Sequence, residues 1–241
     1  MPTPPVDLTG IEVVIFDKDG TLIDFHAMWG GWARTLGDRL DAAIRRPVSP
    51  DVYATIGFDP STGRVAPSGL LATGTMAGIE ETIATVLRRY CPSIAAARRA
   101  TQAAWFLPDP ADAVPLADLR TLFARLHDAG RRIAVVTTDD RTPTEATLRA
   151  LGVRPLVGAL VCGDDGFAMK PAPDPVFAIC HAFRSEPSRV LVVGDTPADL
   201  QMGRSAGAGL VVGVRSGVTP PADLVGADAL IGSVGDLLAI V

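Results

Sequence analysis

The sequence predicts an α/β protein: a doubly wound parallel sheet that carries a helical insert after its first strand. From residue 116 onward, short apolar runs alternate with longer segments of helical spacing. This alternation is typical of parallel strands that helices cover on both faces. Near the front of the chain, one isolated apolar strand at 11–16 precedes a long stretch of helical character. A lone strand needs the later strands as neighbours, so the stretch between them is interpreted as an insertion.

The first elements after the insert follow from apolar spacing and from helix-end signals. A helix is expected over 115–129, ended by Gly130, because apolar residues recur at helical spacing along it. A buried strand is expected at 133–136. The next helix is predicted to begin at Thr142, which would cap it, with Pro143 in the first turn and an acidic residue after it. It would end at Gly152.

The remaining strands and helices alternate in the same way. Strands are predicted at 156–161, 190–193 and 210–212, where the chain is continuously apolar or nearly so. Helices are predicted to open at the Asp174–Pro175 and Thr196–Pro197 pairs, because proline is favoured in the first helical turn.

The insert at 24–115 is predicted to form a helical subdomain. It contains three helical patterns, at about 26–46, 75–90 and 92–106, and an irregular segment over 57–74. The expected domains are therefore a Rossmann-like core from 1–23 with 116–241, and the helical subdomain from 24–115.

Composition excludes several classes of function. Hydrophobic residues make up 48% of the chain, which allows a sizeable core, and the net charge is -5. No nucleic-acid partner is expected, because that function generally requires a basic stripe. No membrane partner is expected, because no apolar run approaches the roughly 18 residues that span a bilayer, and the N-terminus lacks the features of a signal peptide. Cys91, Cys162 and Cys180 are scattered, which is typical of reduced thiols in a cytoplasmic protein.

The strongest functional signal is the sequence Phe-Asp-Lys-Asp-Gly-Thr at the end of the first strand, with acidic residues at Asp17 and Asp19. Residues two apart in an extended segment point to the same face, so the two carboxylates are expected to converge. Ligands of open α/β sheets bind outside the carboxyl ends of the strands, where this pair lies. The alternative is an ordinary Asp-Gly turn.

Three further signals follow later strands. Asp195 comes directly after the strand at 190–193, and Asp199 follows four residues on. A capping box of Thr196 with Asp199 would explain Asp199 without chemistry, but not Asp195. Two weaker signals are Thr137 with Thr138, and Lys170 between the helix patterns. The alternative is an ordinary turn for the threonines and a surface residue for the lysine.

Together, in this order along the chain, these four signals resemble the signature motifs of the haloacid dehalogenase (HAD) superfamily, and most closely its phosphoglycolate-phosphatase-like branch. The resemblance covers nearly the whole chain, although the insert matches by position and helical character only. Thr138 departs from the asparagine that many relatives carry, and its backbone N–H is expected to serve instead.

The resemblance implies a Mg²⁺-dependent phosphatase that acts on a small-molecule phosphate ester through an aspartyl-phosphate. It implies that Asp17 is the nucleophile, that Asp19 is the general acid and base, and that Asp17, Asp195, Asp199 and the Asp19 backbone carbonyl serve the metal. It further implies that phosphoryl oxygens are bound by Thr137, Thr138 and Lys170.

The insert is similar to a helical cap of the C1 type, which lies between the first and second motifs. Within it, His26, Trp29 and Arg64 are candidates for reading the substrate. The alternative for Trp29, ordinary packing within the cap, carries more weight.

Other functions remain open at this point. A phosphomutase or phosphotransferase could use the same four motifs. A phospho-receiver domain shares the chemistry, but its phosphoacceptor follows a middle strand and it has no cap. A non-catalytic binding protein is the third alternative. The sequence does not identify the phosphate ester, and it allows a monomer or a homodimer.

Overall fold

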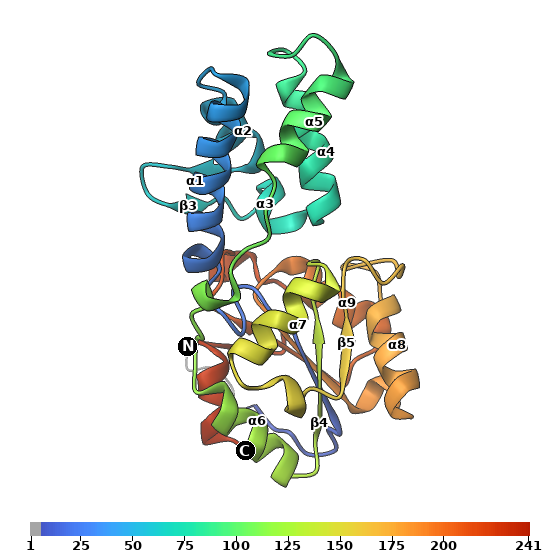
Figure 1. Ribbon diagram of the computed structural model, residues 1–241. Helices are drawn as coiled ribbons and strands as arrows, with labels where there is room; N and C mark the ends of the chain where they lie inside the picture. The colour runs from blue at the N-terminus through green and yellow to red at the C-terminus, as the bar shows by residue number, and fades with distance from the viewer. Residues whose placement is uncertain (1–5) are drawn as a thin grey trace. The chain divides into compact units, whose positions relative to one another are not determined.

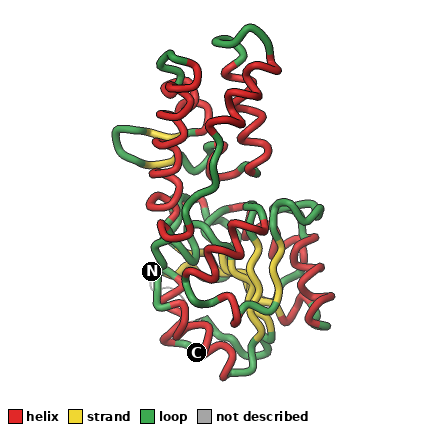
Figure 2. Tube along the Cα trace, viewed as in Figure 1, coloured by secondary structure: helices red, strands yellow, loops and turns green. Residues whose placement is uncertain are grey.

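The computed structural model describes residues 6–241, which form two compact units. Unit 1 combines the front of the chain, to Asp24, with Ala113–Val241, and unit 2 consists of Phe25–Asp112. Strands are gathered in unit 1, whereas unit 2 is mostly helical (Figure 2). The N-terminal segment 1–5, where no signal peptide was predicted, lies outside the described residues.

Unit 1 is built on a six-stranded parallel sheet with the order β5-β4-β1-β6-β7-β8. The first strand in the chain is therefore a central strand, flanked by strands that lie more than a hundred residues away in sequence. The strands are β1 (Val13–Phe16), β4 (Arg132–Val136), β5 (Ala159–Val161), β6 (Val190–Gly194), β7 (Leu210–Val214) and β8 (Ala229–Ile231).

Register brings the carboxyl ends of the three middle strands to one edge. Phe16, the last residue of β1, lies opposite Val135 of β4 and Val193 of β6. The residue after it, Asp17, still donates its N–H to the Val193 carbonyl at 2.9 Å. Polar residues that follow these strands are thus placed beside one another, as the sequence predicts.

Helices cover both faces of this sheet, as expected for a doubly wound fold (Figure 1). On one face, α8 (Asp174–Phe183) and α9 (Pro197–Ala206) pack against Val13 and Ile15 of β1. On the other face, Phe123 of α6 (Leu119–Asp128) stacks on Phe16, with ring centroids 5.3 Å apart. The alternation of β1 side chains between two buried faces explains why the strand is continuously apolar.

Several predicted boundaries in unit 1 are wrong by a few residues. Helix α6 begins at Leu119 rather than at 115, and β5 begins at Ala159 because a 3-10 helix, Arg154–Leu156, precedes it. Helix α7 (Arg141–Ala150) begins before Thr142, and Asp140 stands at its N-cap without a side-chain hydrogen bond. Glu145 binds the guanidinium groups of Arg149 and Arg154 instead of a helix end. Strand β8 was not predicted.

Unit 2 contains five α-helices, α1 (Phe25–Ile44), α2 (Ser49–Ile56), α3 (Leu70–Thr73), α4 (Met76–Leu87) and α5 (Ile94–Ala104), and a 3-10 helix, Pro110–Asp112. The three long helical patterns predicted by the sequence correspond to α1, α4 and α5. The segment 57–74, predicted as irregular, instead holds an antiparallel hairpin of β2 (Phe58–Asp59) and β3 (Arg64–Val65), followed by α3. Asp59 closes its turn by accepting hydrogen bonds from Ser61 and Thr62.

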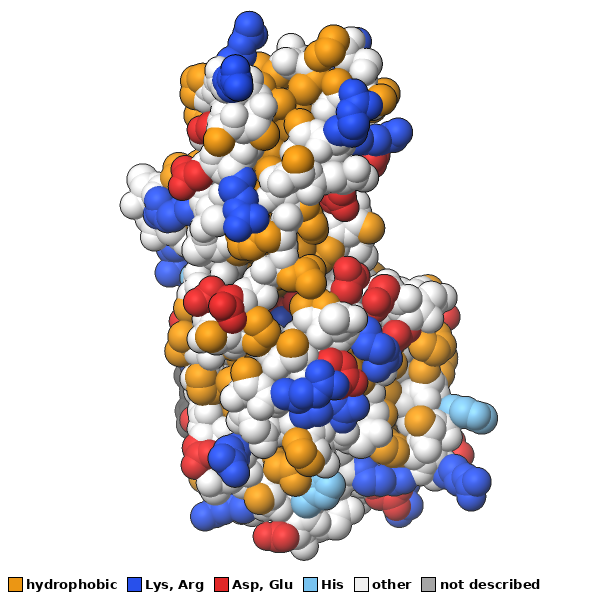
Figure 3. Space-filling view, viewed as in Figure 1, with side chains coloured by type: hydrophobic (Ala, Val, Ile, Leu, Met, Phe, Trp, Pro, Cys, Tyr) orange, Lys and Arg blue, Asp and Glu red, His pale blue; other side chains and the backbone are white. Residues whose placement is uncertain are grey.

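All three cysteines are unpaired; Cys162 and Cys180 are buried, and Cys91 is half-buried. Within the described part of the chain, none of the helices combines the length and apolar character that crossing a bilayer requires. Basic and acidic side chains are interspersed on the visible face of unit 1 (Figure 3).

Candidate active site

Asp17 stands at the centre of the predicted site, directly after β1. Its side chain is buried, with 8% of the residue exposed. One carboxylate oxygen, Oδ1, accepts a hydrogen bond from Lys170 Nζ at 2.5 Å. The other, Oδ2, is buried and has no hydrogen-bond partner among residues 6–241. A buried carboxylate oxygen without a partner is costly, so it indicates a missing ligand.

Two more buried carboxylates lie beside Asp17. Asp195 follows β6, and Asp199 lies in the first turn of α9. One oxygen from each of the three residues lies within 4.8 Å of the others. The structure therefore brings together three of the predicted carboxylates at the carboxyl edge of the sheet.

Asp195 is positioned by the loops that follow β1 and β7. Its Oδ1 accepts a hydrogen bond from the Thr21 hydroxyl at 3.3 Å, and its Oδ2 accepts one from the Val218 N–H at 3.0 Å. A Cβ at Gly217 would lie 1.9 Å from Oδ2, and one at Gly20 would lie 2.5 Å from it. Two glycines thus leave the room that the carboxylate needs. The loop around Gly217 was not predicted to take part, because its residues match none of the four motifs.

Asp199 serves a helix cap and the site at once. Its Oδ2 accepts hydrogen bonds from the N–H and the hydroxyl of Thr196, at 3.0 and 2.6 Å, which completes the capping box of α9. Its Oδ1 is then directed to Lys170 Nζ at 2.7 Å. The two interpretations of Asp199 from the sequence are therefore compatible.

Lys170 connects two of the carboxylates with the end of β4. Besides Asp17 and Asp199, its ammonium group donates to the Val136 carbonyl at 3.3 Å. Burial lowers the pKa of Lys170, but the carboxylates of Asp17 and Asp199 outweigh it and raise that pKa above its usual value. Lys170 consequently remains a cation inside the site.

The three carboxylates carry more negative charge than Lys170 neutralises. Burial above all, with Asp199 and Asp19, raises the pKa of Asp17 to about 7 against the lowering effect of Lys170. Burial, together with the charges of Asp17 and Asp199, also raises the pKa of Asp195 well above its usual range. An all-carboxylate donor set with excess charge and a partnerless oxygen fits a hard divalent cation such as Mg²⁺.

The other predicted residues of unit 1 lie around this cluster. Thr137 is buried directly after β4, and its N–H donates to Val161. Thr138, the next residue, is half-buried. Asp19 is close enough to raise the pKa of Asp17, but its carboxylate is not one of the three clustered groups. The chain bends at Lys18 instead of remaining extended, and one Asp19 carboxylate oxygen lies 2.6 Å from Lys18 Nζ.

The side chains of Lys18 and Asp139, to which no role was predicted, extend the site. Lys18 is only 1% exposed, and its ammonium group lies 2.6 Å from Asp19 Oδ2 and 2.8 Å from Asp139 Oδ2. Although burial lowers the pKa of Lys18, Asp139 and Asp19 together raise it above its usual value. Nothing in the sequence indicated which carboxylates the Lys18 ammonium group would contact.

Comparison with protein families decides the membership of the chain. The model of the haloacid dehalogenase-like hydrolases matches residues 11–207, which span both units. The chain belongs to this family. The superfamily expected from the four motifs is thereby confirmed.

Among HAD relatives, the chain is 29% identical to a phosphoglycolate phosphatase of Rhodospirillum rubrum over 208 residues, which cover 83% of this chain and 78% of that protein. It is 34% identical to an N-acetylmuramic acid 6-phosphate phosphatase of Pseudomonas aeruginosa over 117 residues, 48% of this chain and about half (49%) of the relative. A crystal structure of a HAD phosphatase from Thermococcus onnurineus superposes with a TM-score of 0.68 at 19% identity, covering 95% of this chain and 97% of that one, which supports the fold.

The three substrate-reading candidates of this HAD protein lie in unit 2. His26, in α1, accepts a hydrogen bond from the Val65 N–H on its Nδ1 at 3.4 Å. Trp29 is 3% exposed and meets Trp32 edge to face at 5.5 Å, as the packing alternative predicts. Arg64 is exposed on β3. No role in substrate binding follows from these contacts alone.

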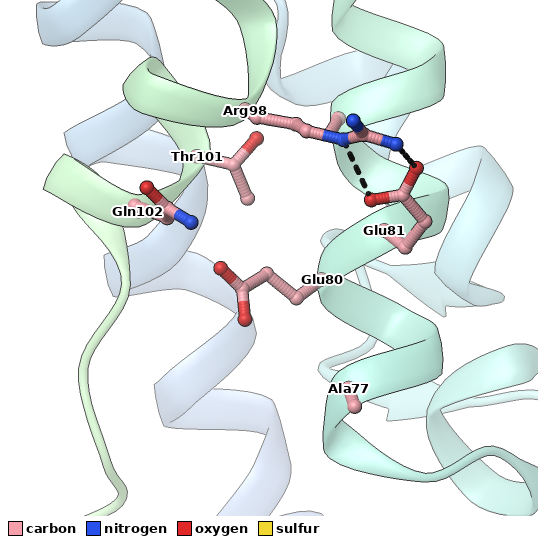
Figure 4. Close-up of a pocket in the computed structure, with 7 residues that line it drawn as sticks. Ala77, Glu80, Glu81, Arg98, Thr101 and Gln102 are labelled. Atoms are coloured by element: carbon pink, nitrogen blue, oxygen red, sulfur yellow. Dashed lines mark hydrogen bonds and ion pairs between the residues drawn. The ribbon is translucent and has the colours of Figure 1, made fainter. Parts of the chain in front are cut away.

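A pocket in unit 2 lies between α4 and α5 and contains none of the predicted residues (Figure 4). Arg98 and Glu81 form an ion pair across its rim at 2.6 Å, with both side chains about half exposed. Exposed pairs of this kind contribute little to stability. The pocket is lined by Ala77, Glu80, Glu81, Ala84, Arg98, Thr101 and Gln102.

Proposed function

We propose that this protein is a Mg²⁺-dependent phosphatase that hydrolyses a small-molecule phosphomonoester. One observation carries the proposal: Asp17 has one oxygen held by Lys170 and the other without a partner, beside Asp195 and Asp199. The names of the two relatives support a phosphate ester as substrate, because both are phosphatases of small phosphorylated molecules.

In the first step, a carboxylate oxygen of Asp17 attacks phosphorus while the bond from phosphorus to the ester oxygen breaks. Asp19 donates a proton to the leaving alcohol, and an aspartyl-phosphate remains on Asp17. In the second step, Asp19 takes a proton from water, and the resulting nucleophile attacks phosphorus. Inorganic phosphate leaves, and the Asp17 carboxylate is restored.

The remaining residues neutralise and position charge, which is most of the task in phosphoryl transfer. Lys170, Thr137 and Thr138 bind phosphoryl oxygens, and Asp199 holds Lys170 at 2.7 Å for this purpose. Asp17 and Asp195, assisted by the Asp19 backbone carbonyl and by Asp199, would hold Mg²⁺. When bound, Mg²⁺ supplies positive charge that offsets the negative charge of the phosphoryl group and of the carboxylates.

We further propose that unit 2 is a cap of the C1 type that selects the leaving group, because the chain inserts it between the first and second motifs. Arg64 and His26 are the better candidates for contacting substrate; Trp29 is committed to packing. A cytoplasmic location and a monomeric or homodimeric state remain predictions from the sequence.

The test is release of inorganic phosphate from a panel of phosphomonoesters, with wild type and Asp17→Asn in parallel. Wild type should turn over with Mg²⁺, stop when EDTA removes the metal, and lose all measurable turnover in Asp17→Asn. Phosphate release that persists in Asp17→Asn would exclude Asp17 as the nucleophile. Transfer to a sugar acceptor in place of water would favour the mutase alternative.

A further inference from the structure

Lys18 is the buried cation that connects the first motif to the loop after β4. Its ammonium group lies between the carboxylates of Asp19, at 2.6 Å, and Asp139, at 2.8 Å. Both carboxylates are largely shielded, with 13% of each side chain exposed. An ammonium group this deeply buried requires such partners, because an unpaired buried charge is strongly destabilising.

The backbone on both sides of Lys18 is fixed. Its carbonyl oxygen accepts hydrogen bonds from the N–H groups of Leu22 and Ile23, at 2.8 and 3.1 Å. Asp19 pairs with Ile23 in an isolated bridge. The lysine side chain therefore projects from a rigid turn.

Asp139 is fixed as well, and by residues of the same site. Its N–H donates to the Thr137 hydroxyl at 3.2 Å, and its carbonyl accepts from the Gly163 N–H at 2.8 Å. The loops after β4 and β5 thus hold the far end of the ion-pair chain. These ion pairs run from the fixed carboxylate of Asp139, through the Lys18 ammonium group, to the carboxylate of Asp19.

We propose that Lys18, anchored by Asp139, is a positioning residue that fixes the Asp19 carboxyl for proton transfer to the leaving alcohol. The inference rests on the proposed function, because it requires Asp19 to be the general acid. Lys18 binds one Asp19 oxygen and so determines the direction of the carboxyl plane. Displacements of about 1 Å in such a group can cost on the order of 10²-fold in rate.

The leaving group provides a readout that a merely structural role would not change. An alkyl phosphate loses a basic alkoxide, which needs the proton of a general acid, whereas p-nitrophenyl phosphate loses a stabilised phenolate, which needs it little. A misplaced Asp19 should therefore slow the first step selectively for alkyl esters, and kcat/KM reports that step. Its weaker action as the base of the second step is common to both esters and enters kcat alone. General acid catalysis typically contributes about 10²–10⁴-fold.

The experiment compares kcat and kcat/KM of wild type, Lys18→Met and Asp139→Asn on p-nitrophenyl phosphate and on the best alkyl phosphate of the wild-type panel. Asp19→Asn serves as the benchmark for loss of the acid. We expect Lys18→Met to lower kcat/KM on the alkyl ester by about 10²-fold, and on the nitrophenyl ester by less than about tenfold. Asp139→Asn should show the same selectivity with a smaller loss.

Arg204→Met is the matched control, because it removes an ion pair of unit 1, with Asp228 at 2.5 Å, outside the site. Its effect, if any, should be equal on both esters. Equal losses of kcat/KM in Lys18→Met on the two esters, or no loss, would overturn the inference. If Lys18→Met does not unfold cooperatively on heating, the losses of Asp139→Asn on the two esters are compared in its place to test the inference. Activity in Asp17→Asn would instead refute the proposed function, so the two failures are distinguishable.

Discussion

At Gly217, a single methyl group would collide with the Asp195 carboxylate. The added Cβ would lie 1.9 Å from Oδ2, the oxygen that accepts the Val218 N–H. No real Cβ tolerates such an approach, so the carboxylate would have to turn away from this position. The position of the Asp195 carboxylate therefore depends on Gly217, a residue without a functional side chain.

Gly217→Ala should accordingly lower kcat/KM by about 10- to 100-fold, because it displaces a proposed metal ligand. It should also raise the Mg²⁺ concentration that gives half-maximal activity. Gly31→Ala is the control: Gly31 is exposed in α1, and a Cβ there would have nothing within 4 Å. A Mg²⁺ requirement unchanged in Gly217→Ala would argue against Asp195 as a ligand.

The raised pKa of Asp17 makes metal binding depend on pH. Without metal, burial above all raises this pKa to about 7 from an ordinary value of 3.8. The folded state therefore holds a proton that the unfolded chain releases, and the free energy of unfolding should fall as pH rises from about 4 to 7. Mg²⁺ must displace that proton, so its binding should strengthen over the same range.

We expect the Mg²⁺ concentration for half of the maximal Tm increase to be at least about tenfold lower at about pH 7.5 than at about pH 5.5. Thermal unfolding at a series of Mg²⁺ concentrations measures this. Asp17→Asn should weaken the dependence, because it removes one titrating ligand. Equal half-saturation at both pH values in wild type would contradict the raised pKa.

At the scale of elements, two threonines near helix starts have different roles. Thr196 caps α9, and its hydroxyl also holds Asp199 Oδ2 at 2.6 Å. Thr142, the predicted cap of α7, lies one residue inside that helix and is exposed. The Thr-Pro sequences are alike, but the polypeptide before α7 enters the helix earlier, from Asp140.

Thr196→Ala should therefore lower the free energy of unfolding of unit 1 by about 1 kcal/mol. Thr142→Ala should change it by less than about 0.5 kcal/mol, as exposed substitutions usually do. Urea unfolding followed by far-ultraviolet circular dichroism compares the two. A larger loss in Thr142→Ala than in Thr196→Ala would show that the assignment of caps is wrong.

What the sequence could predict depends on how local each signal is. Strands β1, β6 and β7 are buried on both faces, and their continuous apolar runs were sufficient to locate them. Strand β8 and the hairpin of β2 and β3 were missed, because strands of two or three residues show a pattern only where a longer apolar run surrounds them, as it does around β5. Helix α2 was missed although Ser49–Pro50–Asp51 is a typical helix start.

The same reasoning applies to the site. Asp17, Asp195 and Asp199 were predictable because each follows or begins an element that the sequence already locates. The pairing of Lys18 with Asp139 was not, because it depends on β1 and β4 being neighbours in the sheet. The approach of Gly217 to Asp195 likewise depends on the loop after β7, whose path no local pattern indicates.

For the whole of unit 1, strand order determines where chemistry can occur. The chain begins at β1, adds β4 and β5 on one side, and then crosses to add β6, β7 and β8 on the other. Ligands of open α/β sheets bind where the order reverses in this way. Asp17 lies at this point, between Thr137 after β4 and Asp195 after β6.

Backbone hydrogen bonds join the two segments of unit 1 at which the chain leaves for unit 2 and returns from it. The Asp24 N–H donates to Val114 at 2.8 Å, and the Leu116 N–H donates to Leu22 at 2.9 Å. The whole insert is therefore equivalent to a loop of unit 1 whose two ends are held together by hydrogen bonds. Closing a loop twice as long costs only about 0.6 kcal/mol more. Evolution can thus exchange or enlarge the insert, and with it the proposed selection of the leaving group, while the residues of unit 1 are inherited intact.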